Sequence, residues 1–433
     1  MTRILLTTSA MPSHVRPTTA IARRLATDGH EVTWYTGAPF RELVESTGAT
    51  FVASRVELDV DAALHAGGSR RGLARLNELV LATFLAPIPA YMADLAAHVD
   101  RVDPDVVVAD HSFRAGLFLA EQRAIPRVAV SVGPLNLSSV DTAPFGTGLP
   151  PATGLPGRLR NRVRHRLVRH VRSRDLQRAA RRIRAEAGLP PLGGFFIDWA
   201  SLVADRYLEA TVPELEYPRR DLLPTVEFVG ALLESGVDDW QPPAWWPELQ
   251  AERQRCRPVV FVTQGSISTD PADLLLPAIE ALAGEELLVV ATTSGRDPDE
   301  LLPSGRRPAN VRLAEFVPYV DVLAVSDLVV SNGGYGGVQT ALAQGVPLVV
   351  AGTSEDKREI TNRLVWSGAG VSLSSDTPSP AAIRAAVRAV LADRTYRTRA
   401  RSLQAAYARY DAPARAADAI LEVAGLRPRS RAA

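Results

Sequence analysis

Short β-rich runs alternate with helical segments along this chain, and the alternation begins twice. The first series contains the expected strands 3–8, 31–37, 50–54, 105–110 and 126–132. Strands separated by helices at this spacing are typical of a parallel sheet with helices on both faces. The sequence therefore predicts a doubly wound α/β domain in its first half.

A second series of strands follows in the second half: 258–266, 287–294, 311–317, 327–332 and 347–352. A chain of 433 residues is long for one ordinary core and suits two domains of about 200 residues each. We therefore expect an N-terminal domain over 1–235, a linker rich in Pro and Trp over 236–257, and a C-terminal domain over 258–408. Ligands of such sheets bind beyond the carboxyl ends of the strands, so a cleft between the two domains is the expected site.

The composition excludes several classes of protein. Hydrophobic residues make up 46% of the chain and charged residues 22%, which is typical of a soluble globular protein. No apolar run reaches the roughly 18 residues of a membrane span, and no signal peptide is evident, so the cytoplasm is the expected compartment. The single cysteine, Cys256, excludes an internal disulfide framework and a Cys-cluster metal site. A net charge of +1 gives no overall attraction to nucleic acid or membranes.

An arginine-rich segment, 158–184, has two interpretations. Such a run can bind nucleic acid, but Leu159, Val163, Leu167 and Val171 recur every four residues and form one apolar stripe. Interleaved aromatic residues are absent, which favours an amphipathic helix over a nucleic-acid site.

The stretch "VVSNGGYGGVQTALAQGVPLVVAG" (329–352) has the order strand, glycine loop, helix and strand. Glycines at a strand-to-helix turn let a ligand approach the backbone, and the free amides of the helix N-terminus favour a phosphate. A tight turn without a ligand is the alternative. No Gly-Lys-Ser/Thr follows, as a Walker A loop requires, and "TTSAMPSH" after the first strand lacks a dinucleotide-binding fingerprint.

Taken together, these motifs resemble a family 1 glycosyltransferase of the GT-B fold, in the group of bacterial antibiotic and macrolide glycosyltransferases. The similarity rests on "PSHVRP", "VVADHSF", "VTQGS" and the long block "EFVPYVDVLAVSDLVVSNGGYGGVQTALAQGVPLVVAGTSEDK". It implies two Rossmann-like domains facing across a cleft. It also implies that the helix in 409–425 packs back on the first domain, ahead of a short tail, 426–433.

The resemblance implies a donor site in the second domain. Phe316 and Val317 fall where the nucleobase is stacked and read through the backbone. Gln264 and Ser266 fall in a second phosphate-side loop, and Thr340 falls at a ribose position. Asp356 and Lys357 fall on a pair that holds sugar hydroxyls. The main phosphate loop accounts for the other expected donor residues: Asn332, Gly333, Gly334, Tyr335, Gly336 and Gly337.

Three of these residues depart from the pattern of the family. Asn332 stands where many relatives have a phosphate-binding histidine, and it could equally be a turn residue. Thr340 replaces a glutamate that grips the ribose hydroxyls, and Lys357 replaces a glutamine. The loss of a carboxylate acceptor favours a dTDP-sugar slightly over a UDP-sugar.

A base is needed to remove the proton of the acceptor hydroxyl. All seven histidines lie before residue 171, so the first domain must supply it. In the family, residues matching His14 and Asp110 form the base and the carboxylate that orients it. His14 could instead be a loop residue beside a helix that starts at Pro17. His111 is a rival base, but in an extended strand end it would face away from Asp110.

The predicted function is inverting transfer of a sugar from a nucleotide sugar to a hydroxyl of a small hydrophobic natural-product aglycone. No cofactor is expected, and no metal, since no His/Asp/Glu cluster has ligand spacing. A sugar-nucleotide 2-epimerase of the same fold, or a catalytically silent binding partner, stays open. We expect no nucleic-acid partner, no membrane span, and a monomer or homodimer.

Overall fold

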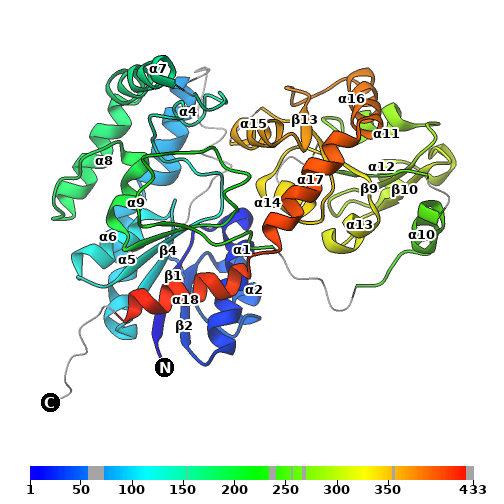
Figure 1. Ribbon diagram of the computed structural model, residues 1–433. Helices are drawn as coiled ribbons and strands as arrows, with labels where there is room; N and C mark the ends of the chain where they lie inside the picture. Colours follow the sequence, from blue (N-terminus) through cyan, green and yellow to red (C-terminus); the bar gives the residue numbers. More distant parts are fainter. Residues whose placement is uncertain are drawn as a thin grey trace.

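A computed structural model describes residues 1–56, 73–152, 154–233, 240–254, 257–265, 270–353 and 356–425. Two separate parallel sheets dominate it and stand side by side (Figure 1). The first sheet has the strand order β3-β2-β1-β4-β5-β6-β7, and the second has β10-β9-β8-β11-β12-β13. In each sheet the chain starts in the middle, runs to one edge and then switches to the other side. This is the doubly wound order that the sequence predicts.

The first sheet is formed by β1 (Arg3–Thr7), β2 (Glu31–Thr36), β3 (Thr50–Ala53), β4 (Val106–Asp110), β5 (Arg127–Ser131), β6 (Arg206–Glu209) and β7 (Val226–Phe228). Alternate residues of each strand enter different cores because successive side chains point to opposite faces. Leu5 and Val107 lie in the core under α5 (Ile88–Val102) and α6 (Arg114–Gln122). Ile4 and Val106 lie in the core under α1 (Pro12–Thr27). Both faces are buried, as expected for an all-parallel sheet.

The second sheet comprises β8 (Val259–Thr263), β9 (Leu288–Thr292), β10 (Val311–Ala314), β11 (Leu328–Ser331), β12 (Leu348–Val350) and β13 (Gly370–Ser372). Its helices are α11 (Leu275–Leu282), α12 (Pro298–Leu301), α13 (Tyr319–Val325), α14 (Tyr335–Ala343), α15 (Lys357–Ser367), α16 (Pro380–Ala392) and α17 (Arg394–Tyr407). Two hydrophobic cores again lie on opposite faces, one containing Phe261 and the other Val260.

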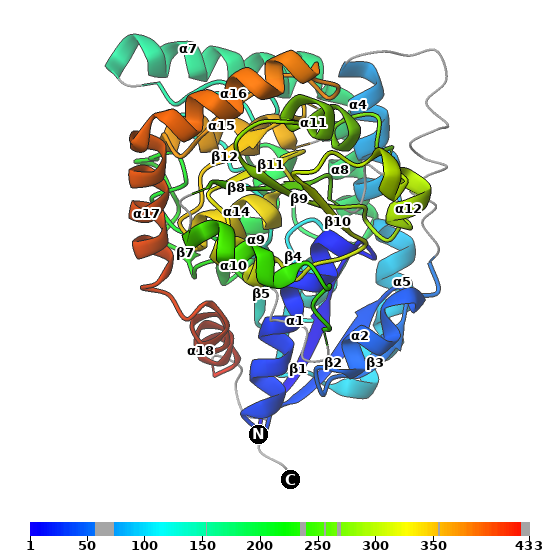
Figure 2. The same cartoon turned by 90° about the vertical axis from the view of Figure 1, so that its right-hand side faces the viewer.

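The last helix, α18 (Ala412–Ala424), belongs to the core of the first domain. Its buried residues Ala416, Ile420 and Val423 share that core with α1 and the first sheet. In Figure 2, which turns the second domain towards the viewer, α18 lies below α17 and beside α1. The chain therefore crosses from the first domain to the second and back.

Part of the expected linker is helical. Helix α10 (Trp246–Gln254) lies within it, and Leu249 is fully buried in the core of the second domain. Trp240, Trp245 and Trp246 pack against that core. The aromatic residues of this segment thus attach it to the C-terminal sheet.

Two local expectations are wrong. The first helix begins at Pro12 rather than near Pro17, so Pro17 lies inside it. In α7 (Gly154–Leu167) the apolar stripe of the arginine-rich segment faces outward: Leu159 is 62% exposed and Val163 57%. The segment does form the expected helices, since α8 (Arg174–Glu186) follows and buries Leu176, Ala180 and Ile183.

Residues 77–102 form a helical stretch that is long and apolar enough, by length and composition, to cross a membrane, with a mean hydropathy of 1.6. This stretch runs through a π-helical turn (Leu81–Leu85) into α5, which buries Tyr91, Leu95 and Val99 against the first sheet. Core helices of globular domains pass the same test, so one such helix is weak evidence for a membrane span.

Candidate active site

His14 and Asp110 meet at the carboxyl edge of the first sheet. Asp110 is the last residue of β4, and His14 lies in the first turn of α1, just after β1. Strands β1 and β4 are neighbours, so their carboxyl ends lie side by side. The Nδ1 atom of His14 is 2.8 Å from Oδ2 of Asp110. The His14 side chain is 17% exposed and that of Asp110 only 2%, which places the imidazole between the carboxylate and solvent.

Two serines fix the Asp110 carboxylate. The Ser112 hydroxyl donates to Oδ2 at 2.8 Å, and the Ser112 amide donates to Oδ1 at 3.1 Å. The backbone amide of Ser9 lies 3.4 Å from Oδ2, and the two serine hydroxyls are 3.1 Å apart. Neither serine was identified from the sequence, although an aspartate followed two residues later by serine at a strand end is a common turn signal.

His111 does not face away from Asp110, contrary to expectation. The strand ends at Asp110, and the chain turns at once, because the Phe113 amide donates to the Asp110 carbonyl at 2.8 Å. The alternation of an extended strand therefore no longer applies at His111. Its Nδ1 lies 3.4 Å from Oδ1 of Asp110, and its ring stacks on that of His14 at 6.5 Å. One carboxylate thus serves two histidines.

The charges of the pair stabilise each other. Burial alone would lower the pKa of His14, but Asp110, with a smaller effect from Asp356, raises it above its ordinary value. Burial would raise the pKa of Asp110, but His14 and His111 hold it well below the usual range. Asp110 is therefore a carboxylate near neutral pH, which holds the proton of His14 on Nδ1 and leaves Nε2 as the basic nitrogen.

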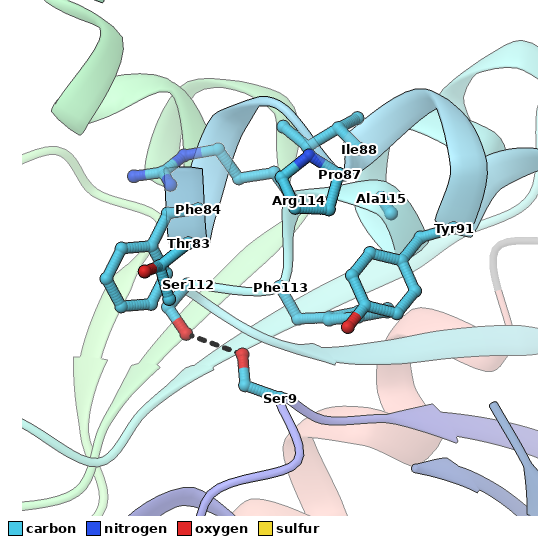
Figure 3. A pocket seen from close by; sticks show the side chains of 10 residues that line it. All are labelled: Ser9, Thr83, Phe84, Pro87, Ile88, Tyr91, Ser112, Phe113, Arg114 and Ala115. Carbon is cyan, nitrogen blue, oxygen red and sulfur yellow. Dashed lines mark hydrogen bonds between the residues drawn. The ribbon is translucent and has the colours of Figure 1, made fainter. Parts of the chain in front are cut away.

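A pocket opens beside this pair in the first domain (Figure 3). Ser9 and Ser112 form one side of it, next to Asp110. The apolar and aromatic part of its lining comes from Phe84, Pro87, Ile88, Tyr91 and Phe113. Tyr91 and Phe113 contact each other edge to face, with ring centroids 4.7 Å apart. The volume of this pocket is about 20 Å³, which is room for about one water molecule, so it marks an apolar wall beside the pair and not a closed cavity for a whole ligand.

The glycine loop lies between β11 and α14 in the second domain. Gly333 has φ +79°, a conformation that other residues rarely adopt. Gly334 is the N-cap, no side chain of the described residues caps the helix, and Gly336 lies exposed in the first turn. The Tyr335 side chain instead points into the core and is 7% exposed, so only its backbone can face a ligand. These free amides at a helix N-terminus fit an anion.

A second pocket lies beside this loop and brings together three of the expected donor residues. Gln264, Asn332 and Lys357 all line it. The Asn332 side chain donates to the Gln264 carbonyl, and the Gln264 side chain accepts from the Leu275 amide at 3.2 Å. Asn332 thus ties the loop after β11 to the loop after β8, and it lines a pocket at the same time.

The remaining donor residues differ in exposure. Phe316 is 53% exposed, whereas Val317 is fully buried and can offer only its backbone. The Thr340 hydroxyl donates to the Gly336 carbonyl at 2.7 Å within α14. Asp356 is close enough to raise the pKa of His14 from across the two domains. Ser266 lies outside the described residues. Among the described residues, no group of three or more His, Cys, Asp or Glu side chains could hold a metal ion.

Comparison with known proteins identifies the family of the chain. The model of the erythromycin biosynthesis protein CIII-like C-terminal domain matches residues 277–423. The chain is 43% identical to 4′-demethylrebeccamycin synthase of Lentzea aerocolonigenes, over 96% of this chain and 98% of the relative. It is 33% identical to UDP-glycosyltransferase 2 of Phaeomoniella chlamydospora, over 97% and 95% of the two chains.

Among solved structures, the calicheamicin glycosyltransferase CalG4 has the same fold. It superposes with a TM-score of 0.75 at 24% identity, covering 99% of this chain and all of that one. The fold, the paired sheets and these full-length relatives lead to one assignment: the chain belongs to the GT-B glycosyltransferases of antibiotic and secondary-metabolite type.

Proposed function

We propose that this glycosyltransferase moves a sugar, with inversion, from a nucleoside diphosphate sugar to a hydroxyl of a small hydrophobic aglycone. The observation that carries the proposal is the His14–Asp110 pair, 2.8 Å apart, beside the apolar pocket of the first domain. The anion-compatible N-terminus of α14 in the second domain supports the same assignment.

In this mechanism Nε2 of His14 takes the proton of the acceptor hydroxyl. The acceptor oxygen forms a bond to the anomeric carbon while the bond from that carbon to the diphosphate breaks. Asp110 stabilises the imidazolium that forms and is not itself protonated. A single displacement of this kind inverts the anomeric configuration, so the product of an α-linked donor is a β-glycoside.

The departing diphosphate takes the electron pair and gains negative charge. The free amides of Gly336 and Gly337, in the first turn of α14, are suited to stabilise it. Lys357 and Asn332, which line the neighbouring pocket, are proposed to contact the phosphates or the sugar. We expect transfer without an added metal ion, because these groups can carry the charge stabilisation.

The test is to incubate the protein with UDP- or dTDP-sugars and a panel of aromatic and macrolide aglycones, and to measure released nucleoside diphosphate. Release that requires an acceptor, with a glycoside of inverted anomeric configuration by NMR, supports the proposal. Release of diphosphate with 2-epimerised sugar and no acceptor indicates an epimerase. Nucleotide binding without turnover under all conditions indicates a silent partner.

A further inference from the structure

Helix α7 contacts its own domain through polar side chains. The buried amide of Asn161 donates to the Val140 carbonyl at 3.1 Å, and Nε of Arg158 lies 2.9 Å from the Asp141 carboxylate. Nε2 of His165 lies 3.0 Å from a backbone carbonyl of the same loop. A surface helix of a globular domain usually buries its apolar side and exposes its polar side. In α7 this arrangement is reversed.

An apolar stripe runs along the solvent side of α7 and into the π-helical turn that follows it (Val168–Arg172). Its members recur every four residues and are between 43% and 78% exposed: Leu155, Leu159, Val163, Leu167 and Val171. In both Figure 1 and Figure 2, α7 lies at the top of the molecule, where an extended surface can reach it. Exposed apolar side chains that follow one another in this way mark an interaction site.

The neighbouring helix α8 shows that arginine-rich helices of this domain need not expose apolar residues. Helix α8 belongs to the same arginine-rich segment, and it buries Leu176, Ala180 and Ile183 in the core of the first domain. Its exposed side carries arginines, such as Arg178 and Arg181. The exposed stripe is therefore a property of α7 and not of the composition of the whole segment.

The charge around the stripe is positive. Between Asp141 and Asp175 the sequence has eight arginines and no acidic residue, although the net charge of the whole chain is only +1. Arg162 and Arg166 each follow a member of the stripe by three residues, so they lie beside it on the helix, and both are exposed. An occupant of this surface therefore has to accept apolar side chains and arginines at the same time.

An anionic lipid bilayer meets both requirements, because its headgroups attract arginines and its acyl chains accept an apolar helix face. A nucleic acid would pair with the arginines but would leave the apolar stripe in water. A second copy packed stripe to stripe would bring two sets of arginines together, and like charges repel. Helix α7 has 14 residues, many of them charged, whereas a membrane-spanning helix needs about 20 apolar ones. It can therefore lie on a bilayer but not cross it.

We propose that α7 docks this enzyme on the surface of an anionic lipid bilayer. The helix lies parallel to the surface, with the apolar stripe among the upper parts of the acyl chains. The arginines reach the lipid phosphates, because their long side chains can extend from the buried side of the helix to the headgroups. The local charge supplies an attraction that the net charge of the chain does not. The inference concerns a docking surface and does not depend on the proposed transfer at His14.

Cosedimentation of the full-length protein with vesicles tests the proposal. We would compare vesicles of phosphatidylcholine with vesicles of phosphatidylcholine and phosphatidylglycerol in equal parts, without donor or acceptor. The protein should bind the anionic vesicles at least about tenfold more tightly, and added salt should weaken that binding. Absent binding, or equal binding to both kinds of vesicle, would overturn the proposal. Because no substrate is present, a failure of glycosyl transfer would not change this result.

A pair of charge-removing variants locates the attraction. Arg162→Gln/Arg166→Gln should weaken binding to the anionic vesicles by about tenfold. Arg178→Gln/Arg181→Gln removes the same charge from the exposed side of α8 and should weaken the binding far less. Equal losses in the two variants would mean that the domain attracts lipid through its overall charge, which would overturn the assignment to α7.

A pair of apolar variants tests the insertion of the stripe. Leu159→Gln/Val163→Gln should weaken binding to the anionic vesicles by about tenfold while the melting temperature stays near that of wild type, because both side chains are exposed. Leu202→Gln/Val365→Gln changes two exposed apolar residues elsewhere and should bind like wild type.

Two results would assign the stripe to something other than lipid. If only the α7 charge variant loses vesicle binding and the stripe variant does not, the contact is purely electrostatic and the apolar face is not inserted. If ultracentrifugation shows a dimer that Leu159→Gln/Val163→Gln dissociates, and vesicles are not bound, the stripe is an interface between two copies of the chain. Either result would contradict the proposal.

Discussion

The guanidinium of Arg363 and the carboxylate of Glu216 form a buried ion pair that joins the two domains. Nε of Arg363, in α15, lies 2.6 Å from Oε1 of Glu216, which follows β6 of the first sheet, and both side chains are at most 2% exposed. Arg363 also donates to the Leu135 carbonyl at 2.9 Å and to Glu359 at 3.0 Å. The Glu359 carboxylate in turn accepts from the Gly146 and Gly148 amides of the first domain. Helix α15, which begins at the expected sugar-binding residues, is thus held against the first domain.

Replacing Arg363 with methionine should destabilise the protein strongly. The change leaves Glu216 as a buried carboxylate without its main partner, and such losses cost about 3–5 kcal/mol. The double variant Arg363→Met/Glu216→Gln should recover part of that cost. Denaturant unfolding measures the free energy of unfolding of both variants. The exposed pair Arg24–Asp28 provides the control, because Arg24→Met should lower the free energy of unfolding by less than about 1 kcal/mol. Equal costs at the two sites would show that the interdomain pair contributes no more than a surface pair.

If His14 is the base, as proposed, the activity should have a defined pH dependence. His14 must be neutral to act as a base, and its pKa is raised by Asp110, so activity should fall as the pH drops through a value above 6.5. Asp110→Asn removes the carboxylate, which should lower the pKa of His14 and shift the acid limb of kcat to lower pH. It should also reduce kcat, as should His14→Ala, by roughly 10²–10⁴.

The control for this prediction is nucleotide affinity. His14→Ala and Asp110→Asn lie in the first domain, so the Kd for the nucleoside diphosphate should change little. A loss of nucleotide affinity in parallel with activity would mean that His14 supports the donor site and not the proton transfer.

The sequence predicts most of the sheet framework because parallel strands buried on both faces are apolar throughout. The expected strand 258–266 contains β8, and 105–110 contains β4, each fully buried. The strands that were missed are short edge or near-edge segments. Strand β6 (Arg206–Glu209) has four residues with a charged residue at each end, and β7 (Val226–Phe228) and β13 (Gly370–Ser372) have three residues each and are only partly buried. None of the three carries a long apolar run.

Within the site, motif spacing locates residues at strand ends but not the contacts between them. It places His14 and Asp110 at neighbouring carboxyl ends, and the structure brings them within 2.8 Å. It does not reveal that the chain turns at Asp110 and brings His111 onto the same carboxylate. The pairing of Glu216 with Arg363, 147 residues apart, also depends on how the two domains dock, which no local pattern encodes.

The buried carboxyl group of Glu209 predicts that the protein becomes less stable as the pH rises. It is fully buried at the end of β6, and neither carboxyl oxygen has a well-aligned hydrogen-bond partner among the described residues. Burial, and then the charge of Glu216, raise its pKa well above the ordinary 4.5. The folded state therefore holds a proton that the unfolded state loses above about pH 4.5. The free energy of unfolding should fall as the pH rises from there towards the folded-state pKa.

Glutamine resembles the protonated acid and cannot ionise. Glu209→Gln should therefore raise the melting temperature near pH 8 more than near pH 5, which scanning calorimetry at the two values would measure. Substitution of the exposed Glu280 by glutamine serves as the control and should change neither value appreciably. A Glu209→Gln variant that is less stable at pH 8 would show that the carboxylate is ionised and paired in the fold.

Helix α18 should be necessary for the stability of the first domain. Ile420 is fully buried between α18 and the first sheet, so Ile420→Ala should cost about 2–5 kcal/mol. Asp418→Ala, on the exposed side of the same helix, should cost far less. Chemical denaturation compares the two. Similar small losses would mean that α18 contributes little to the core on which it lies.

The residue at position 340 predicts whether the protein prefers a ribose or a deoxyribose donor nucleotide. The resemblance to the family implies that Thr340 occupies the position of a glutamate that often holds the ribose hydroxyls. The Thr340 side chain is 9% exposed, and its hydroxyl donates to the Gly336 carbonyl inside α14. A threonine in this arrangement offers no carboxylate to a ribose, and the loss of such a charge-assisted hydrogen bond costs about 1.5–3 kcal/mol. A deoxyribose has no 2′-hydroxyl and loses less.

We therefore expect dTDP to compete as well as or better than UDP in an equilibrium binding assay. Including dUDP separates the 2′-hydroxyl from the methyl group of thymine, since dUDP and UDP differ only in that hydroxyl. Thr340→Glu should shift the UDP-to-dUDP ratio towards UDP by roughly tenfold, which corresponds to about 1.4 kcal/mol. Glutamine has the same length as glutamate but no charge, so Thr340→Gln should shift the UDP-to-dUDP ratio less than Thr340→Glu does. Wild-type protein that binds UDP more than tenfold tighter than dTDP would contradict the assignment of the nucleotide. It would leave the proposed transfer reaction untouched, because His14 and Asp110 are proposed to act on the acceptor and not on the ribose.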